Sequence, residues 1–191
     1  MLIEIDSIPK SLIYEEDEGK PIYYKGYKKV LAGQITLEET MGSSLLQSRL
    51  ISQIFIFLSK NLNLDQYEIL VSELGLQLDK KITRSCDIAI YEKELIKEIE
   101  DAKTYSSLPP KIVFEIDLKA DLEGTSEDNY YHKKTQQLLD FGVEKLIWIS
   151  TESKKVMIAT PNAPWLIINW TDEFEIMDGL KLNLAELIAK A

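Results

Sequence analysis

The sequence has only one cysteine and no long apolar run, and each absence excludes a class of protein. Cys86 alone cannot form an internal disulfide, which is typical of a reducing compartment. Because no run of about 18 apolar residues occurs, the sequence predicts no transmembrane helix and no membrane partner. The first residues, MLIEIDSIPK, lack a basic stretch followed by an apolar one, so we expect no secretion signal and a cytoplasmic location.

Positive charge is also scarce, since 22 Lys and Arg stand against 32 Asp and Glu, giving a net charge of −10. Lys and Arg supply most of the non-specific affinity for nucleic acid, so this composition argues against an architectural DNA-binding protein. It is compatible with an enzyme that has a small acidic site, because a bound metal can reverse the local field. The sequence offers three modest basic spots: Lys25, Lys28 and Lys29; Lys80, Lys81 and Arg84; and Lys133 and Lys134.

What the sequence does contain is the pattern of one α/β domain. Its 191 residues, 45% of them hydrophobic, are enough for one substantial core, so we predict a single domain over 1–191. Within it we expect an N-terminal extension over about 1–35, a core over about 43–160, and C-terminal strands and a helix over about 161–191.

Two helices stand out in the core. Apolar residues at three- and four-residue spacing predict a helix that begins after Ser43 or Ser44. A second helix is predicted from about Asp128, as its cap, to Phe141, with Gly142 as the residue that ends it. KELIKEIEDAK indicates a short solvated helix and LNLAELIAK a closing one.

Strands are expected between and after these helices. The segments are PIYY, EILVSEL, GLQLD, CDIAIY, KIVFEIDLK and EKLIWIS, followed by KKVMIAT and WLIINW as antiparallel additions. The strand–helix–strand connection through 128–141 predicts a right-handed crossover between parallel strands. The charged run EEDEGK is interpreted as a solvated turn. The expected fold is therefore a mixed sheet flanked by helices.

Two carboxylates interrupt apolar strands, where an unpaired charge is costly to bury. They are Asp87 and Glu115. If the second strand continues, its pleat places Asp117 and then Lys119 on the same face as Glu115. Such an oxygen cluster suits Mg²⁺, which polarises a phosphoryl oxygen and activates water. The alternative is that each acid only pairs with a basic residue at a strand end.

Other side chains have plainer interpretations. We expect His132 to be a solvated surface residue and Cys86 a small buried hydrophobe. Trp148, Trp165 and Trp170 lie in apolar strands and are expected in the core or an interface. The tyrosines of IYYKGY either stack on bases or, more commonly, pack against a strand edge.

These motifs, in this order, resemble the Uma family of restriction-endonuclease-like proteins, part of the PD-(D/E)xK nuclease superfamily. The resemblance covers about 20–160. It rests on CDIAIY, KIVFEI, KKTQQLLDFGV and EKLIWI, on the helix LLQSRLISQIFIFLSKNL, and on Lys134 standing eight residues before Gly142.

The resemblance implies a restriction-endonuclease-like fold in which Asp87 and Glu115 hold Mg²⁺ or Mn²⁺ and Lys134 stabilises the developing charge. It also implies metal-activated water attacking a phosphodiester of nucleic acid, with DNA as the expected substrate, and a homodimer. Asp117, Lys119 and Gln47 would play supporting parts.

Three positions depart from the family pattern. Asp117 stands where the strand lysine belongs, Cys86 replaces a proline before Asp87, and Gln47 replaces a histidine. Gln47 can orient a water but cannot act as a base near neutral pH. With the acidic net charge, these departures motivate a second hypothesis, a non-catalytic binding or assembly module with a vestigial site.

Overall fold

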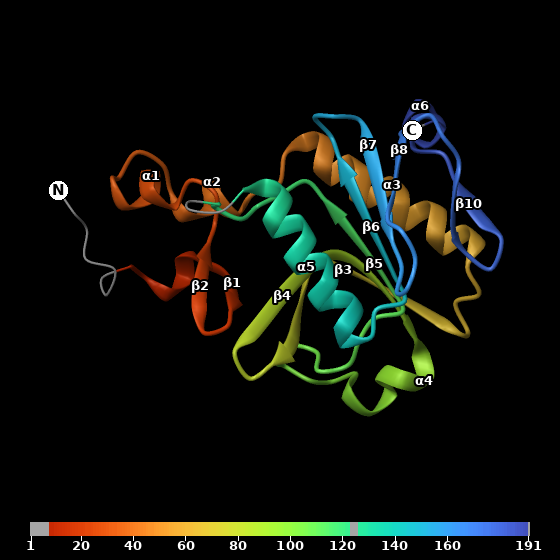
Figure 1. The fold of residues 1–191 in the computed structure, drawn as a ribbon, viewed down its shortest axis with the longest axis horizontal. Helices are drawn as coiled ribbons and strands as arrows, with labels where there is room; N and C mark the ends of the chain where they lie inside the picture. Colours follow the sequence, from red (N-terminus) through yellow and green to blue (C-terminus); the bar gives the residue numbers. More distant parts are fainter. Residues whose placement is uncertain (1–7, 123–125, 191) are drawn as a thin grey trace.

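An eight-stranded mixed sheet forms the centre of the protein (Figure 1). The structure is a computed structural model that describes residues 8–122 and 126–190. Strands follow the order β2-β1-β4-β5-β6-β7-β8, and β3 pairs with β4 beside this path. Their bounds are β1 Ile13–Asp17, β2 Lys20–Tyr23, β3 Tyr67–Asp79, β4 Ile82–Glu92, β5 Ile112–Ile116, β6 Lys145–Ser150, β7 Lys155–Ala159 and β8 Leu166–Asn169. The predicted α/β class, with a mixed sheet flanked by helices, is confirmed.

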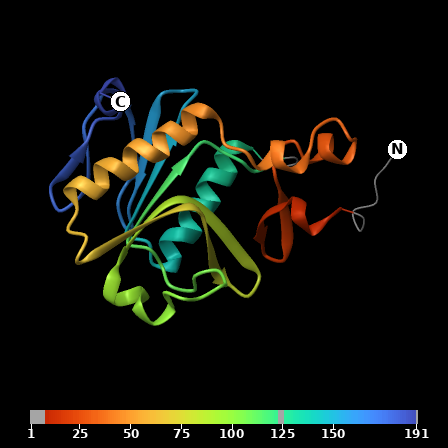
Figure 2. The ribbon, with the colours of Figure 1, turned by 180° about the vertical axis from the view of Figure 1, so that it is seen from behind.

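Helices α3 and α5 lie on opposite faces of this sheet, as the front and back views show (Figures 1 and 2). A second sheet, β9 (Phe174–Met177) with β10 (Leu180–Leu182), adds to the core on the α3 side. The helices are α1 Tyr27–Leu31, α2 Leu37–Met41, α3 Leu45–Asn61, α4 Lys93–Ile96, α5 Glu127–Phe141 and α6 Leu184–Ala189, with 3₁₀ turns at Lys10–Leu12 and Lys97–Ile99. In the described ranges, no helix has the length and apolar character needed to cross a membrane.

The sequence places α3 correctly. Ser44 caps the helix, because its hydroxyl accepts a hydrogen bond from the Gln47 backbone N–H at 3.1 Å. The apolar stripe Leu50, Ile54 and Leu58 is fully buried against the sheet. One face of α3 therefore fixes the strands from one side and brings Gln47, in its first turn, to the end of β5.

The β5–α5–β6 unit is also as predicted, with β5 and β6 parallel and paired from Ile112↔Lys145 to Ile116↔Ile149. The predicted cap of α5 is wrong by two residues, because the Ser126 hydroxyl, not Asp128, accepts from the Asn129 N–H at 3.2 Å. Asp128 lies in the first turn instead, where a negative charge complements the helix dipole. Gly142 ends the helix with a φ of 121°.

The two predicted strands EILVSEL and GLQLD are one long strand, β3, interrupted at Ser72 and Glu73. Both residues have positive φ (78° and 56°), and the pairing with β4 shifts register between Val71 and Leu74. Such an irregularity redirects side chains out of the pleat. It leaves Glu73 in contact with Lys119, at the rim of the candidate site.

The expectation of a solvated turn at EEDEGK is wrong in its first half. Residues Ile13–Asp17 form β1, and only Glu18 and Gly19, with φ of 53° and 80°, make the turn into β2. Strand β1 packs beside β4, paired at Glu16↔Thr83. Glu15 consequently points into the protein and is 2% exposed. The division into extension, core and C-terminal part stays a prediction.

Candidate active site

Asp87 and Glu115 lie on neighbouring antiparallel strands, β4 and β5. The pairing of the two strands ends at Ile88 with Phe114, and Asp87 and Glu115 are the next residues beyond this last pair. The Asp87 carboxylate is close enough to Glu115 to raise its pKa, and it accepts a hydrogen bond from the N–H of Ile116, the residue after Glu115. The two acids that the sequence singles out are therefore brought together on the sheet.

Asp87 is held at the end of β5 and is 5% exposed. Its Oδ2 accepts a hydrogen bond from the Ile116 backbone N–H at 2.7 Å, while the Gln47 amide donates to the Ile116 carbonyl at 2.8 Å. Burial raises the pKa of Asp87 to about 6, against the lowering influence of the Ile116 N–H, Lys134 and Gln47. Gln47 thus supports this acid from the first turn of α3.

Glu115 is 2% exposed, and its environment strongly disfavours a negative charge. Burial raises its pKa to about 8, and the nearby Asp87 carboxylate adds to this rise, although Lys134 opposes it. Its buried Oε1 has no hydrogen-bond partner among the described residues; its contact is an ion pair with Lys134 Nζ at 2.8 Å. An under-coordinated oxygen of this kind is suited to receive a cation.

Lys134 reaches Glu115 from α5 and is 1% exposed. Its ammonium donates to Glu15 Oε1 at 2.7 Å and lies among the rings of Tyr14, Tyr130 and Trp148, 5.5–5.9 Å from their centroids. Burial alone lowers the pKa of Lys134, but Glu115 and Glu15 outweigh it and hold the pKa well above its ordinary value. The helix-borne lysine is therefore a fixed cation beside Glu115.

Glu15 is the member of this cluster that sequence reasoning missed. Its Oε2 accepts from the Tyr130 hydroxyl at 2.6 Å and lies 3.4 Å from Arg84 Nη1, and its Oε1 accepts from the Ser85 N–H at 3.0 Å. Lys133 and Lys134 were expected to share a basic spot, and Arg84 to belong to another. Arg84 and Lys134 are instead buried and neutralised by acids.

The only signal in the sequence was indirect. Arg84 and Lys134 lie inside a strand and a helix pattern, where a buried cation requires an acidic partner. The acid-rich segment EEDEGK, interpreted only as a turn, could supply such a partner. Nothing local identifies Glu15 as the partner, because Arg84 lies 69 positions away and Lys134 lies 119 positions away.

The predicted place of Asp117 is wrong. Strand β5 ends at Ile116, and Asp117 has a φ of 59°, so the pleat does not carry it onto the face of Glu115. Its carboxylate accepts from the backbone N–H and the hydroxyl of Thr151, each at 2.7 Å. Asp117 ties the end of β5 to the β6–β7 turn.

Lys119 does come to the site, by a different route from the one expected. Its Nζ lies 3.9 Å from Asp87 Oδ1 and also contacts Glu73 and the Ser43 hydroxyl. Burial lowers the pKa of Lys119 to about 8, with Lys134 adding to the effect. Lys119 is thus a partly exposed cation at the rim, whereas Lys134 is the deep one.

The plainer interpretations are mostly confirmed. Cys86 is buried and Trp148 is a core residue whose indole donates to the Thr135 hydroxyl at 2.9 Å. His132 is exposed and stacks on Trp165. Trp170 packs in the core on the α3 side.

The donor set fits a magnesium-type ion held by two carboxylates. Over 8–122 and 126–190, no group of three or more His, Cys, Asp or Glu side chains could hold a metal. Mg²⁺ does not need such a group, because it commonly keeps several waters and binds one or two protein carboxylates. The pKa of both acids is raised, and Glu115 Oε1 has only the Lys134 ammonium as a partner among the described residues; a cation between the two carboxylates would stabilise their charged forms.

Comparison with known proteins supports the fold. No protein-family model matches the chain, and no curated protein matches it significantly. Among solved structures, it is similar to one described as a putative nuclease belonging to DUF820 from Anabaena variabilis, with a TM-score of 0.63 and 16% identity. The match covers 92% of this chain and 89% of that one. The likeness is in fold, and membership of the Uma family stays a prediction.

Proposed function

We propose that this protein is a metal-dependent phosphodiesterase that cleaves nucleic acid. One observation carries the proposal: Asp87 and Glu115 lie together where the pairing of β4 and β5 ends, with Lys134 Nζ 2.8 Å from Glu115 Oε1. The fold likeness to a protein described as a putative nuclease supports the same class of chemistry. A buried acid pair beside a fixed ammonium is an arrangement suited to phosphoryl chemistry.

Each side chain has a distinct part. Asp87 and Glu115 would hold Mg²⁺ or Mn²⁺, which when bound lowers the pKa of its water and polarises a phosphoryl oxygen. Lys134, kept protonated by two carboxylates, stabilises the negative charge that develops on the phosphoryl group. Gln47 fixes the Ile116 peptide that orients Asp87, and Lys119 offers a second cation at the rim.

Cleavage of DNA and RNA oligonucleotides with Mg²⁺ or Mn²⁺ tests the proposal. We expect Asp87→Asn and Glu115→Gln to lower the rate at least about 100-fold, as losing an essential charge-stabilising group does. Glu98→Gln, a change to an exposed acid in the 3₁₀ turn after α4, is the matched control and should leave the rate unchanged. Equal cleavage by wild type and Asp87→Asn would refute the proposal.

The burial of Asp87, Glu115 and Lys134 favours a second candidate function, a non-catalytic binding or assembly module. In such a module these charged side chains only stabilise the fold. Calorimetric titration separates the two, because a purely structural cluster takes up no divalent ion even at millimolar concentration.

A homodimer is also proposed, from the family resemblance. A monomeric mass in light scattering would contradict it.

A further inference from the structure

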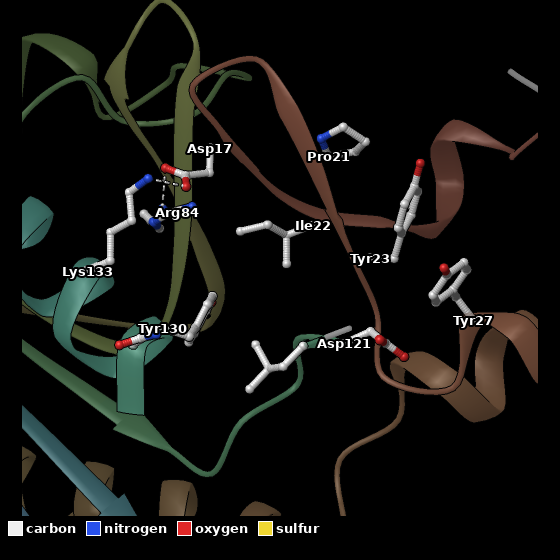
Figure 3. A pocket seen from close by; sticks show the side chains of 11 residues that line it. Asp17, Pro21, Ile22, Tyr23, Tyr27, Arg84, Asp121, Tyr130 and Lys133 are labelled. Atoms are coloured by element: carbon white, nitrogen blue, oxygen red, sulfur yellow. Dashed lines mark hydrogen bonds and ion pairs between the residues drawn. The ribbon is translucent and has the colours of Figure 1, made fainter. Parts of the chain in front are cut away.

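A cavity of about 380 Å³ lies between the N-terminal hairpin and α5 (Figure 3). Pro21, Ile22 and Tyr23 of β2 line one side, and Tyr27 of α1 extends it. Tyr130 and Lys133 of α5 line the side opposite (Figure 3). Its volume falls in the range of small-molecule sites, about 300–1,000 Å³, and the cavity is not needed for the proposed hydrolysis itself.

Aromatic stacking is the most specific feature of this cavity. The rings of Tyr23 and Tyr27 are stacked, with centroids 4.6 Å apart and planes inclined by 22°. Tyr27 is 8% exposed whereas Tyr23 is half-buried, so the accessible end of the stack belongs to Tyr23. A planar ring in the cavity would extend this stack by one member.

The charges around the cavity favour a neutral ring over a phosphate. Arg84 is buried and paired with Glu15 and Asp17. Lys133 Nζ lies 2.6 Å from Asp17 Oδ2. Both cations are thus neutralised within the protein, while the side-chain amide of Asn129, which also lines the cavity, has a donor and an acceptor of the kind that bind the edge of a base.

The cavity is connected to the candidate active site through two hydrogen-bonded side chains. Tyr130 lines the cavity, and its hydroxyl donates to Glu15 Oε2 at 2.6 Å. The other oxygen of Glu15 accepts from Lys134 at 2.7 Å. A ligand that contacts Tyr130 in the cavity is therefore separated from the Lys134 ammonium by two side chains, Tyr130 and Glu15.

We propose that the cavity binds one unpaired nucleobase of the substrate, stacked on Tyr23. The inference rests on the proposed function and narrows its substrate class. Because a paired base cannot enter a pocket, the substrate is single-stranded or carries an extruded nucleotide near the cleaved bond. Recognition through a neutral ring also accounts for nucleic-acid binding by a chain of net charge −10, since it relies little on phosphate contacts.

Fluorescence anisotropy with labelled oligonucleotides tests the proposal without requiring cleavage. Single-stranded DNA, single-stranded RNA and a duplex of equal length are titrated with the full chain in EDTA. We expect either single strand to bind at least about tenfold more tightly than the duplex, and the two single-strand arms identify the sugar preferred. Tyr23→Ala should weaken single-strand binding at least about fivefold, the loss expected for one stacked base.

Three variants control for packing. Tyr23→Phe keeps the aromatic face and should bind like wild type, whereas Tyr23→Leu keeps apolar volume without that face and should bind like Tyr23→Ala. Phe55→Ala, on the exposed side of α3 across the sheet, should leave binding unchanged. The Leu variant also keeps the test valid if the Ala variant does not fold.

The outcomes separate this inference from the proposed hydrolysis. Equal binding of duplex and single strand, or full binding by Tyr23→Leu, overturns the base site even if Mg²⁺-dependent cleavage is found. Tyr23-dependent single-strand binding without any cleavage supports the base site and removes the proposed hydrolysis.

Discussion

At the scale of single residues, the carboxylate of Glu15 is shared by two buried cations, Lys134 and Arg84. It is buried against Lys134, Arg84, Tyr130 and Ser85, so each of two buried cations depends on it. Breaking one side of a buried ion pair leaves an uncompensated charge in a low dielectric, which costs more than the pair itself contributes.

Glu15→Ala should therefore lower the free energy of unfolding by about 3–5 kcal/mol. Glu15→Gln, which keeps the shape and part of the hydrogen bonding, should cost less. Glu18→Gln, a change to a 68%-exposed acid in the adjoining turn, should stay within about 0.5 kcal/mol. Denaturant unfolding measures all three, and equal losses for Glu15→Ala and Glu18→Gln would contradict the role given to Glu15.

Asp87 makes the stability of the metal-free protein depend on pH. Its pKa rises from 3.8 to about 6 on folding, so the folded chain holds this proton more tightly than the unfolded chain does. The associated stability is fully present below about pH 4 and is lost as the pH rises to about 6, a total of roughly 2–3 kcal/mol at 1.36 kcal/mol per unit.

Unfolding free energies of wild type and Asp87→Asn, measured in EDTA between pH 4 and 7, check this expectation. The variant has no titratable group at this position. As the pH rises across this interval, the unfolding free energy of wild type should therefore fall relative to that of the variant. Parallel curves would show that burial of Asp87 does not shift its pKa. Added Mg²⁺ should reduce the difference, because a bound cation favours the carboxylate.

At the scale of elements, the end of β5 decides which lysine the site uses. The strand stops at Ile116, and the positive φ of Asp117 turns its side chain to Thr151. A lysine two residues after Glu115 would therefore not reach the acids. The ammonium comes instead from α5, which lies across the sheet face that carries Glu115.

Asp117→Lys, which places a lysine two residues after Glu115, should not increase cleavage. It should lower stability by about 1–3 kcal/mol, because the Thr151 N–H and hydroxyl lose their acceptor. Lys134→Ala in the same assay should abolish cleavage. If the double variant Asp117→Lys, Lys134→Ala regained activity, the new lysine would have reached the site and this account of β5 would be wrong.

The elements also differ in how far sequence alone could predict them. Ser44, Leu50 and Gly142 mark helices through local patterns, and these predictions are confirmed. Asp117 was misplaced because alternation holds only while a strand continues, and its backbone turns left-handed one residue after β5 ends. A single sequence contains no rule that sets that end point.

At the scale of the whole molecule, the fold class followed from local periodicity, whereas the candidate site followed only in part. Asp87 and Glu115 were found because acids interrupt apolar runs, and the sheet then brings them together just beyond the last β4–β5 pair, Ile88 with Phe114. Glu15 was missed because its role depends on where β1 docks, beside β4 and under α5. Such placement is a property of the assembled chain.

The contact between Glu15 and Lys134 has a consequence for the order of events during synthesis. The carboxylate leaves the ribosome 119 residues before its ammonium partner, and it remains in water until α5 has been made and packed. Contacts between such distant residues form late in folding. The chain between them must first lose the conformational entropy of closing a long loop, and only then do the contacts add stability. A nascent chain that ends before α5 therefore carries the strand acids but not the lysine, and the proposed nuclease activity requires α5 to have been made and packed.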